Sequence, residues 1–355
     1  MGVETWVLLA TVAVLAWIYS KWRHSYWASR GVPSLPATPF LGHIFKSIFT
    51  AKKPWKFQDE LRNKFDDARM CGFYEFFKPT LLVWDTEILK HIFVKDFDYF
   101  VDHRHFDMKT VHERDLVMME MLSAVNGAQW KSLRAIMSPA FTSVLSQRSL
   151  IAQSVLFIIA GYETTASLLD FSSFLLAKHK NQQQRLREEV RQLVKKYGGI
   201  TYHGIMEGKL LKACLQETLR LYPPALFMER YCTKAYKLPG TDLTIRPGDI
   251  VQAPIWALHH DPRHWPDPEA FIPDRFLPEN KGNINSFAHM PFGMGPRNCL
   301  AMRFALMEAK VALAKLLLGA ELELAPGHEE VTLDEQGAFL RSKDLNIKVK
   351  PIMEE

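Results

Sequence analysis

The chain has 355 residues, of which 48% are hydrophobic and 23% are charged, the balance of an ordinary globular protein. This composition excludes a disordered chain, a collagen-like repeat and a coiled-coil rod, and four cysteines are too few for a disulfide-stapled secreted scaffold. The net charge of +5 does not by itself indicate binding to nucleic acid, but it would suit an anionic membrane surface or an acidic partner. The length allows two ordinary domains or one large one.

Residues 5–22 are predicted to form a transmembrane anchor. The run 6–19 carries no charge, and at about 1.5 Å per residue the segment 6–22 spans about 25 Å, just under the core of an endoplasmic-reticulum bilayer. Positive charge follows this run, whereas a cleaved signal peptide carries it before the apolar core. The order favours an uncleaved anchor with its C-terminal side in the cytosol; a buried core helix is the alternative.

The segment 31–42 contains three prolines and is predicted to be a stiff elbow between the anchor and a globular body over 43–355. The body is predicted to be mainly α-helical with a minor β part. Residues 80–95 read as a strand that runs into a helix. Further predicted elements are helices over 128–137, 150–178, 181–197, 209–221 and 300–318, short strands over 229–260, irregular coil over 261–296 and a β-hairpin over 331–352. The helix over 300–318 is apolar almost all round and is therefore expected to be buried.

The strongest candidate site is the loop 291–304, PFGMGPRNCLAMRF. Its glycines and prolines fix a tight turn, and Cys299 is expected at the start of the following helix. A helix N-terminus favours a thiolate, and Arg297 adds positive charge nearby. The loop would therefore present an anionic sulfur as a ligand or a nucleophile. A buried structural cysteine is the alternative, as is a glycine-rich phosphate loop, although the third glycine and the preceding strand of a dinucleotide motif are missing.

The pattern F-G-x-G-x-R-x-C, which runs from Phe292 to Cys299, resembles the haem-binding signature of the cytochromes P450. The resemblance implies that the Cys299 thiolate is the axial ligand of the iron of haem b (iron protoporphyrin IX). The family pattern usually has a glycine two residues after the cysteine, where this chain has Ala301. The implied fold class is cytochrome P450-like, mainly α with a minor β part, internally truncated and with an N-terminal transmembrane helix.

A second motif is E-T-L-R, in which Glu217 and Arg220 share one helix face at a spacing that allows an ion pair. It precedes the segment PDRF, which precedes the cysteine loop. This order resembles the P450 arrangement in which a helical Glu and Arg meet the arginine of P-x-R-F. By that resemblance Arg275 completes a structural lock that is costly to break.

A third motif, A-G-Y-E-T-T at 160–165, lies inside the long apolar helix, where its glycine costs about 1 kcal/mol relative to alanine. An exposed polar turn is the alternative. By the resemblance to P450s this segment lies over the haem, and Ala160 and Gly161 leave room for dioxygen. Thr164 would then hydrogen-bond the dioxygen, and Glu163 would help to deliver protons.

A fourth motif is W-K-S-L-R, in which Trp130 and Arg134 are four residues apart and share a helix face. The resemblance implies that this pair binds a haem propionate, together with Arg230 and Arg297. Arginine suits bidentate carboxylate recognition. The alternative for each arginine is a surface ion pair.

Only residues 139–149 separate the first haem-contacting helix from the oxygen-binding helix, whereas P450s place several helices there. We therefore expect a central helical block to be missing, with a junction near 141–150. The missing part includes the roof of the substrate pocket. The flanking apolar helix should expose surface that it otherwise buries, which marks a partner site or an aggregation risk.

The resemblance covers the chain from the anchor to the C-terminal segment and is strongest to the microsomal, drug- and steroid-oxidising branch. It implies a monooxygenase of the endoplasmic-reticulum membrane, facing the cytosol. Such an enzyme inserts one oxygen atom from O2 into an apolar small molecule with electrons from NADPH-cytochrome P450 reductase and, as a further partner, cytochrome b5. A catalytically impaired isoform that binds haem weakly or only occupies the reductase is the second hypothesis, and a haem-free thiol enzyme with Cys299 as nucleophile is the third.

Overall fold

The computed structural model describes residues 2–43, 54–104, 116–137, 146–334 and 339–352. The contacts between residues divide the chain into two compact units, each assembled from separate stretches of sequence. Unit 1 comprises Met1–Met108, Val125–Lys131 and Phe227–Ala257, and unit 2 comprises Lys109–Ala124, Ser132–Leu226 and Leu258–Glu355. Helix α6 (Gly127–Met137) and helix α11 (Ile255–His259) run from one unit into the other.

Unit 1 is built on a four-stranded sheet with the order β1-β2-β6-β3. Strands β1 and β2 form an antiparallel hairpin, β6 joins β2 in parallel with Thr80 opposite Ile250, and β3 is antiparallel to β6. The elements are α1 (Val3–Arg23), η1 (Ala28–Arg30), α3 (Pro54–Lys64), β1 (Met70–Glu75), β2 (Lys78–Val83), α4 (Thr86–Lys90), η2 (His91–Lys95), η3 (Phe97–Tyr99), β3 (Met228–Tyr231), β4 (Tyr236–Lys237), β5 (Thr244–Ile245) and β6 (Ile250–Ala253).

The segment that follows α1 is fastened to the edge of this sheet by Trp27, which is fully buried. The Trp27 indole lies directly on Gly72 of β1, so close that a Cβ at that position would lie 2.2 Å from the indole Cγ. The backbone N–H of Trp27 donates to the Tyr74 hydroxyl at 2.9 Å. Glycine is therefore required at position 72, because a side chain there would collide with the Trp27 indole. The segment after α1 is in this way held against the sheet of unit 1.

Helix α1 has the length and apolar composition to cross a membrane. Its large side chains are exposed along its length, for example Trp6 at 62%, Leu15 at 60% and Trp22 at 66%. The expected helix over 5–22 is confirmed, and its position in a membrane stays a prediction. The following segment 31–42 contains no helix, as its prolines predict.

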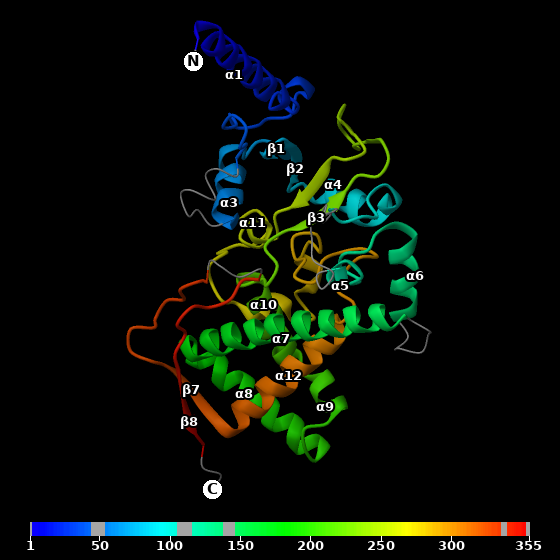
Figure 1. Ribbon diagram of the computed structural model, residues 1–355. Coiled ribbons are helices and arrows are strands. Elements are labelled where there is room, and N and C mark those ends of the chain that lie inside the picture. The colour runs from blue at the N-terminus through cyan, green and yellow to red at the C-terminus, as the bar shows by residue number, and fades with distance from the viewer. Residues whose placement is uncertain (1, 44–53, 105–115, 138–145, 335–338, 353–355) are drawn as a thin grey trace. The chain divides into compact units, whose positions relative to one another are not determined.

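Unit 2 is a helical body in which the long helix α7 contacts α8, α10, α12 and β7. Figure 1 shows α7 lying across α12. Ser146 caps the start of α7, because its hydroxyl accepts the backbone N–H of Ser149 at 3.1 Å. The elements are α5 (Leu116–Met119), α7 (Gln147–Lys178), α8 (Lys180–Tyr197), α9 (Tyr202–Glu207), α10 (Lys209–Leu221), η4 (Pro273–Phe276), η5 (Lys281–Asn283), α12 (Met302–Gly319), β7 (Ala320–Leu324) and β8 (Ile347–Pro351).

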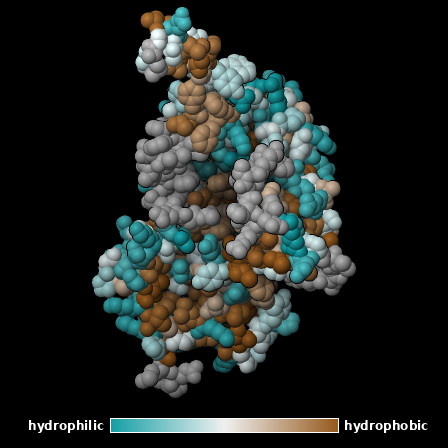
Figure 2. All heavy atoms as spheres, in the orientation of Figure 1, coloured by the Kyte–Doolittle hydropathy of each residue, from teal (hydrophilic) through white to brown (hydrophobic). Residues whose placement is uncertain are grey.

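The N-terminal half of α7 exposes an apolar face, as expected. Ile158 is 71% exposed and Tyr162 is 77% exposed, and Leu150, Ile151 and Ile159 are exposed as well. The C-terminal half is buried and forms part of the main core of unit 2, with residues such as Phe174 and Leu176. Figure 2 shows hydrophobic residues at the surface around α7.

The C-terminal region differs in part from the expectation. Within 331–352 an antiparallel bridge joins Leu333 to Ser342, with hydrogen bonds from the Asp334 N–H to the Arg341 carbonyl and from the Lys343 N–H to the Thr332 carbonyl, but strand β8 pairs with β7 instead, with Val349 opposite Leu322. The alternating pattern predicts a strand but does not choose its partner. Helix α12 is buried only in part, since Phe304 near its start is 61% exposed. Its buried residues, from Ala309 to Leu317, lie where α12 packs on neighbouring helices.

Candidate functional site

The cysteine loop is held by its own backbone. Gly293 and Gly295 have φ angles of 72° and 74°, which favour glycine because larger residues are strained there. The backbone N–H of Cys299 donates to the carbonyl of Phe292 at 2.8 Å, and that of Asn298 donates to Gly295 at 3.0 Å. The predicted tight loop is confirmed, and it fixes the position of the Cys299 side chain.

Arg134 fastens this loop to helix α6. Its Nη1 donates to the backbone carbonyl of Asn298 at 3.0 Å, and its Nη2 donates to the side-chain Oδ1 of the same residue at 3.1 Å. The guanidinium therefore grips the residue immediately before Cys299. The resemblance predicts a haem propionate as the partner of Arg134 and gives no role to Asn298, whose position directly before Cys299 is the signal in the sequence.

The ionisation of Cys299 differs from the expectation. Helix α12 begins at Met302, so the cysteine lies before the first turn. Although Cys299 keeps an exposed surface, partial burial raises its pKa. A hydrogen bond to the Ala301 backbone and the charge of Arg134 act in the opposite direction and are outweighed. The positive charge that lowers the pKa of Cys299 belongs to Arg134 and not to the expected Arg297.

Cys299 is nonetheless the cysteine that can bind a ligand. It is exposed, whereas Cys71, Cys214 and Cys232 are buried, and burial raises the pKa of each of these three thiols. An iron ion would supply the positive charge that the loop lacks, because a coordinating thiol is deprotonated by the metal. A rigid loop with one accessible sulfur fits a haem iron that takes one axial thiolate.

Two buried histidines lie beneath the start of the loop. His259 Nε2 accepts the backbone N–H of Met290 at 2.9 Å, which assigns the proton to Nδ1, and Nδ1 donates to the Arg220 carbonyl at 3.2 Å. The ring of His289 stacks on His259 with centroids 5.2 Å apart. Burial lowers the pKa of His259 well below its ordinary value and that of His289 to about 4. Both rings are therefore neutral at pH 7 and act as polar supports.

The predicted Glu217–Arg220–Arg275 lock is confirmed. Arg220 Nε and Nη2 donate to the two carboxylate oxygens of Glu217 at 2.7 and 2.9 Å, and both residues are fully buried. Arg275 Nε lies 3.5 Å from the Glu217 carboxylate. Arg220 also donates to the carbonyls of His259, Pro268 and Ala270 at 2.7–3.0 Å. The lock therefore joins α10 to the irregular segment that precedes the cysteine loop.

The A-G-Y-E-T-T motif lies within α7, as predicted, at the part of the helix where apolar residues are exposed. The Thr164 hydroxyl donates to the carbonyl of Ala160 at 2.6 Å. Glu163 is part-exposed and lies 3.9 Å from Arg341. Apart from the neighbouring backbone of α7 itself, no atom of the described residues lies within 4 Å of where a Cβ of Gly161 would be. Gly161 therefore has open space beside it, and the Thr164 hydroxyl is hydrogen-bonded within helix α7.

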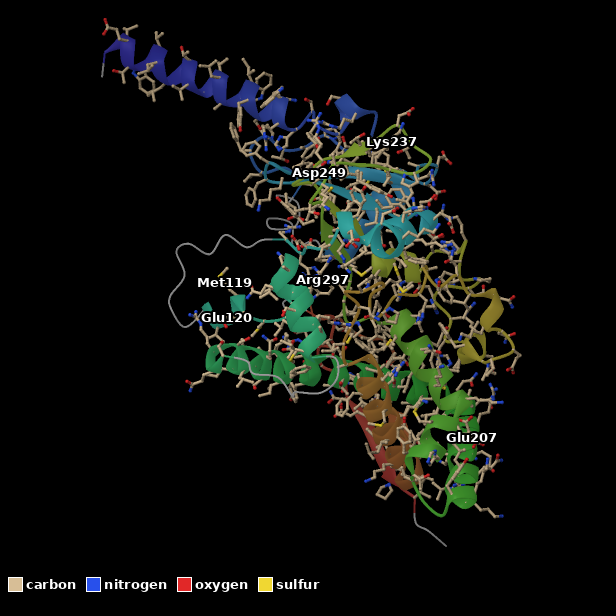
Figure 3. All side chains as sticks on the ribbon, turned by 90° about the vertical axis from the view of Figure 1, so that its right-hand side faces the viewer. Met119, Glu120, Glu207, Lys237, Asp249 and Arg297 are labelled. Atoms are coloured by element: carbon tan, nitrogen blue, oxygen red, sulfur yellow. The ribbon has the colours of Figure 1, made fainter. Side chains whose placement is uncertain are left out.

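The propionate candidates are divided between the two units. Arg134 and Arg297 belong to unit 2, whereas Trp130 and Arg230 belong to unit 1. Arg297 is buried on the cysteine loop, and Figure 3 labels it. Trp130 is buried against Phe97 with ring centroids 5.8 Å apart. The Arg230 guanidinium is buried over the ring of Phe93, at 5.0 Å. Each unit therefore buries a propionate-candidate arginine: Arg297 in unit 2 and Arg230 in unit 1.

Comparison with known proteins identifies the family. The family model described as Cytochrome P450 matches residues 32–150 and 142–350. Cytochrome P450 9e2 of Blattella germanica is 26% identical, with 89% of this chain and 91% of that protein covered. Cytochrome P450 3A41 of Mus musculus is 27% identical, with coverage of 99% and 97%. Cytochrome P450 3A16 of Mus musculus is 41% identical over 227 residues, with coverage of 63% and 43%.

The same comparisons show that this chain is shorter than its relatives. The alignment to cytochrome P450 3A41 runs over 505 positions, and this chain has 355 residues, so a large block of the relative has no counterpart here. The two family-model matches meet at residues 142–150. Both matches together extend over most of the sequence and include the cysteine loop, the lock and the α7 motif, so the chain belongs to the cytochrome P450 family, the haem-thiolate monooxygenases.

Proposed function

We propose that this chain binds haem b through Cys299 and that it belongs to the branch that oxidises apolar small molecules such as steroids, lipids or xenobiotics. The observation that carries the proposal is that Cys299 alone among the four cysteines is exposed, on a loop fixed by its own backbone and by Arg134. Haem supplies the activation of dioxygen when it is bound. The remaining roles belong to side chains of this chain.

In this proposal Trp130, Arg134, Arg230 and Arg297 bind the haem propionates, and Phe292 packs against the macrocycle. Arginine is suited to this role because its planar guanidinium pairs with a carboxylate in a bidentate manner. Arg134 then has two tasks, since it also holds Asn298. A propionate within its reach would compete for, or share, the same donors.

Residues of α7 are proposed to act on the oxygen side. The open space beside Gly161, together with the small side chain of Ala160, leaves room for dioxygen. Thr164 would turn its hydroxyl from the Ala160 carbonyl toward the oxygen, and part-exposed Glu163 would hold a proton for delivery. General acid catalysis requires such groups within hydrogen-bond reach of the reacting atoms.

The proposed location is the endoplasmic-reticulum membrane, with α1 (within residues 5–22) as anchor and the globular body in the cytosol. Lys21 and Arg23 at the C-terminal end of α1 support this orientation, because positive charge is retained on the cytoplasmic side. The proposed electron donor is NADPH-cytochrome P450 reductase, with cytochrome b5 as a further partner. The net charge of +5 suits an acidic docking face.

We also propose that the block missing from this chain falls between α6 and α7. The meeting of the two family-model matches at 142–150 supports this position, and the junction expected near 141–150 begins in residues 138–145, which lie outside the described part of the chain. The exposed apolar face of α7 is what removal of packed helices would leave. These observations favour a second candidate function, an impaired isoform that binds haem weakly or only occupies the reductase.

The test of haem-thiolate binding is a carbon monoxide difference spectrum of the dithionite-reduced full chain. We expect the red-shifted Soret band of a CO-bound ferrous haem-thiolate. Cys299→Ala should abolish this band, and the matched control Cys232→Ala, which removes a buried thiol, should retain it. Retention of the band in both variants would disprove the ligand assignment.

A second measurement on the same preparation distinguishes an active monooxygenase from the impaired isoform. A chain with the thiolate band that consumes NADPH in the presence of reductase and forms oxidised product is an active monooxygenase. A chain without the band that slows a full-length P450 by competing for reductase is the impaired form. Thr164→Val should lower product formed per NADPH consumed without removing the thiolate band, if Thr164 has the proposed role.

A further inference from the structure

A cavity of about 500 Å³ lies in unit 1 at the C-terminal end of α1. It is formed by the end of α1, the turn that follows it, the β1–β2 hairpin and the turn before β6. Figure 3 shows Asp249, one of its residues, beneath the end of α1. The cavity is separate from the cysteine loop, which belongs to unit 2. The lining residues that matter here are Trp22, Arg23, Tyr26, Arg30, Arg246 and Asp249.

Three guanidinium groups face this cavity. Arg23 donates from Nη2 to the Phe77 carbonyl at 3.2 Å, and its buried Nε has no hydrogen-bond partner in the described part of the chain. Arg30 lies over the Tyr26 ring, with its Cζ 3.5 Å from the ring centroid. Arg246 is exposed. Arg30 also donates from Nη1 to the Tyr26 carbonyl at 2.8 Å. Among the residues that the structure describes, these three guanidinium groups form no ion pair with a carboxylate, although the charge of Asp249 acts on Arg30 and Arg246 from a longer distance. The donors that the Tyr26 and Phe77 carbonyls do not use are therefore available to an anion.

Asp249 is the acidic residue among the described lining residues, and its carboxylate is already used. The Tyr26 hydroxyl donates to its two oxygens at 2.8 and 2.7 Å, and the backbone N–H of Arg246 donates to it at 2.8 Å. Three arginines against one aspartate leave the lining of the cavity with a net positive charge, and Asp249 holds Tyr26 and the Arg246 backbone in place.

The position of the cavity indicates the source of the anion. Arg23 is the last residue of α1, directly after Trp22, and Trp is enriched where a span meets the lipid headgroups. If α1 crosses the membrane as proposed above, the cavity lies at the depth of the lipid phosphates on the cytosolic side. Arginine binds phosphate oxygens in a bidentate manner, and phosphates of anionic lipids are concentrated at that surface.

We propose that this cavity is a phosphate-group site that binds the headgroup of an anionic phospholipid. Arg23, Arg30 and Arg246 are its ligands, and the exposed indole of Trp22 contacts the adjoining glycerol and acyl region. The site orients unit 1 against the membrane. This inference rests on the proposed membrane placement of α1 and is independent of haem binding and of oxygenation.

The test uses the full chain in nanodiscs of phosphatidylcholine that contain a minor fraction of phosphatidic acid. Native mass spectrometry then measures the lipids retained by the released protein. We expect phosphatidic acid to be retained in excess over its share of the bilayer. Arg246→Gln should lower this enrichment about fivefold, since one arginine near the surface contributes about 1 kcal/mol. Arg246 is suited to the test because it is exposed, so its replacement leaves the buried contacts of unit 1 intact.

The matched control is Lys21→Gln. Lys21 is at the same end of α1 and carries the same charge, but it does not line the cavity. If Lys21→Gln leaves the enrichment of phosphatidic acid unchanged, the result supports the cavity as the lipid site. An equal loss in both variants overturns this proposal, because it attributes the enrichment to the general positive charge of the surface.

Inorganic phosphate in the buffer, at matched ionic strength, tests whether the phosphate group can also come from free phosphate. Displacement of phosphatidic acid by inorganic phosphate assigns the site to free phosphate as well. No enrichment in the wild type, or failure of the chain to insert, overturns the proposal, and neither outcome alters the carbon monoxide spectrum that tests haem binding.

Discussion

Arg134 connects two features that the sequence presents separately. Its spacing from Trp130 indicates a shared helix face, and its hydrogen bonds reach Asn298 in a loop 164 residues away along the chain. A guanidinium that bridges a backbone carbonyl and a side-chain carbonyl fixes the loop through two directional contacts. The same charge lowers the pKa of Cys299 against the larger effect of burial. Arg134 therefore positions Cys299 and partly compensates the unfavourable surroundings of its thiolate.

We expect Arg134→Ala to weaken haem retention about tenfold or more, since hydrogen bonds from a charged group contribute about 1.5–3 kcal/mol. The rate of haem transfer to an excess of a haem-accepting apoprotein measures the effect. Lys131→Ala is the control, because Lys131 is on the same helix and its side chain pairs with exposed Asp98. Equal haem loss in both variants would show that Arg134 acts only through net charge.

At the scale of elements, the lock between α10 and the coil before the cysteine loop is the main polar connection of unit 2. Arg220 has its carboxylate partner and three backbone carbonyls, all in an environment closed to water. A buried charge is tolerated only when its partners satisfy it. The lock therefore fixes an irregular segment that has no ladder of backbone hydrogen bonds of its own.

Arg220→Met should lower the free energy of unfolding by about 3–5 kcal/mol, because it removes the bidentate partner of the fully buried Glu217 and leaves that carboxylate with the more distant Arg275 as its cation. Chemical denaturation followed by circular dichroism provides the measurement. Arg185→Met is a matched control: it breaks a bidentate arginine–carboxylate pair with Asp274 at 2.8 and 3.0 Å, but that pair is exposed. The control should cost below about 1 kcal/mol. Similar losses in both variants would contradict a special role for the buried lock.

At the scale of the whole molecule, the short length has a visible consequence on α7. One half of this helix is buried in the core of unit 2, and the other half exposes branched and aromatic side chains. Exposed apolar surface of this kind promotes association. The helix that carries the A-G-Y-E-T-T motif is thus continuous over its 32 residues, but neighbouring elements cover only part of its apolar surface.

Ile158→Asp should reduce self-association of the detergent-free globular body, because it places a charge at the centre of this exposed face. Light scattering and binding of a hydrophobic dye should both decrease. Ser154→Asp is the control, since Ser154 is exposed on the same helix and is already polar. If scattering is unchanged by Ile158→Asp, the α7 face is not the surface that associates.

Local structure and the chemistry-bearing residues can be predicted from the amino-acid sequence alone. Helices α6, α7, α8 and α10 follow from their apolar periodicity, and the loop around Cys299 follows from glycines that adopt positive φ angles. These signals are local, because they depend on residues within a few positions of each other. The lock was accessible as well, because the order of its three motifs matched a known family.

Features that depend on contacts between distant segments require the folded chain. In it β8 pairs with β7, Asn298 accepts hydrogen bonds from Arg134, and three cysteines are buried while the fourth is exposed. The pKa of Cys299 is of the same kind, since desolvation depends on all surrounding atoms and outweighs the nearby charge of Arg134. Periodicity identifies a face or a strand, but the partner, the burial and the local dielectric are properties of the folded chain.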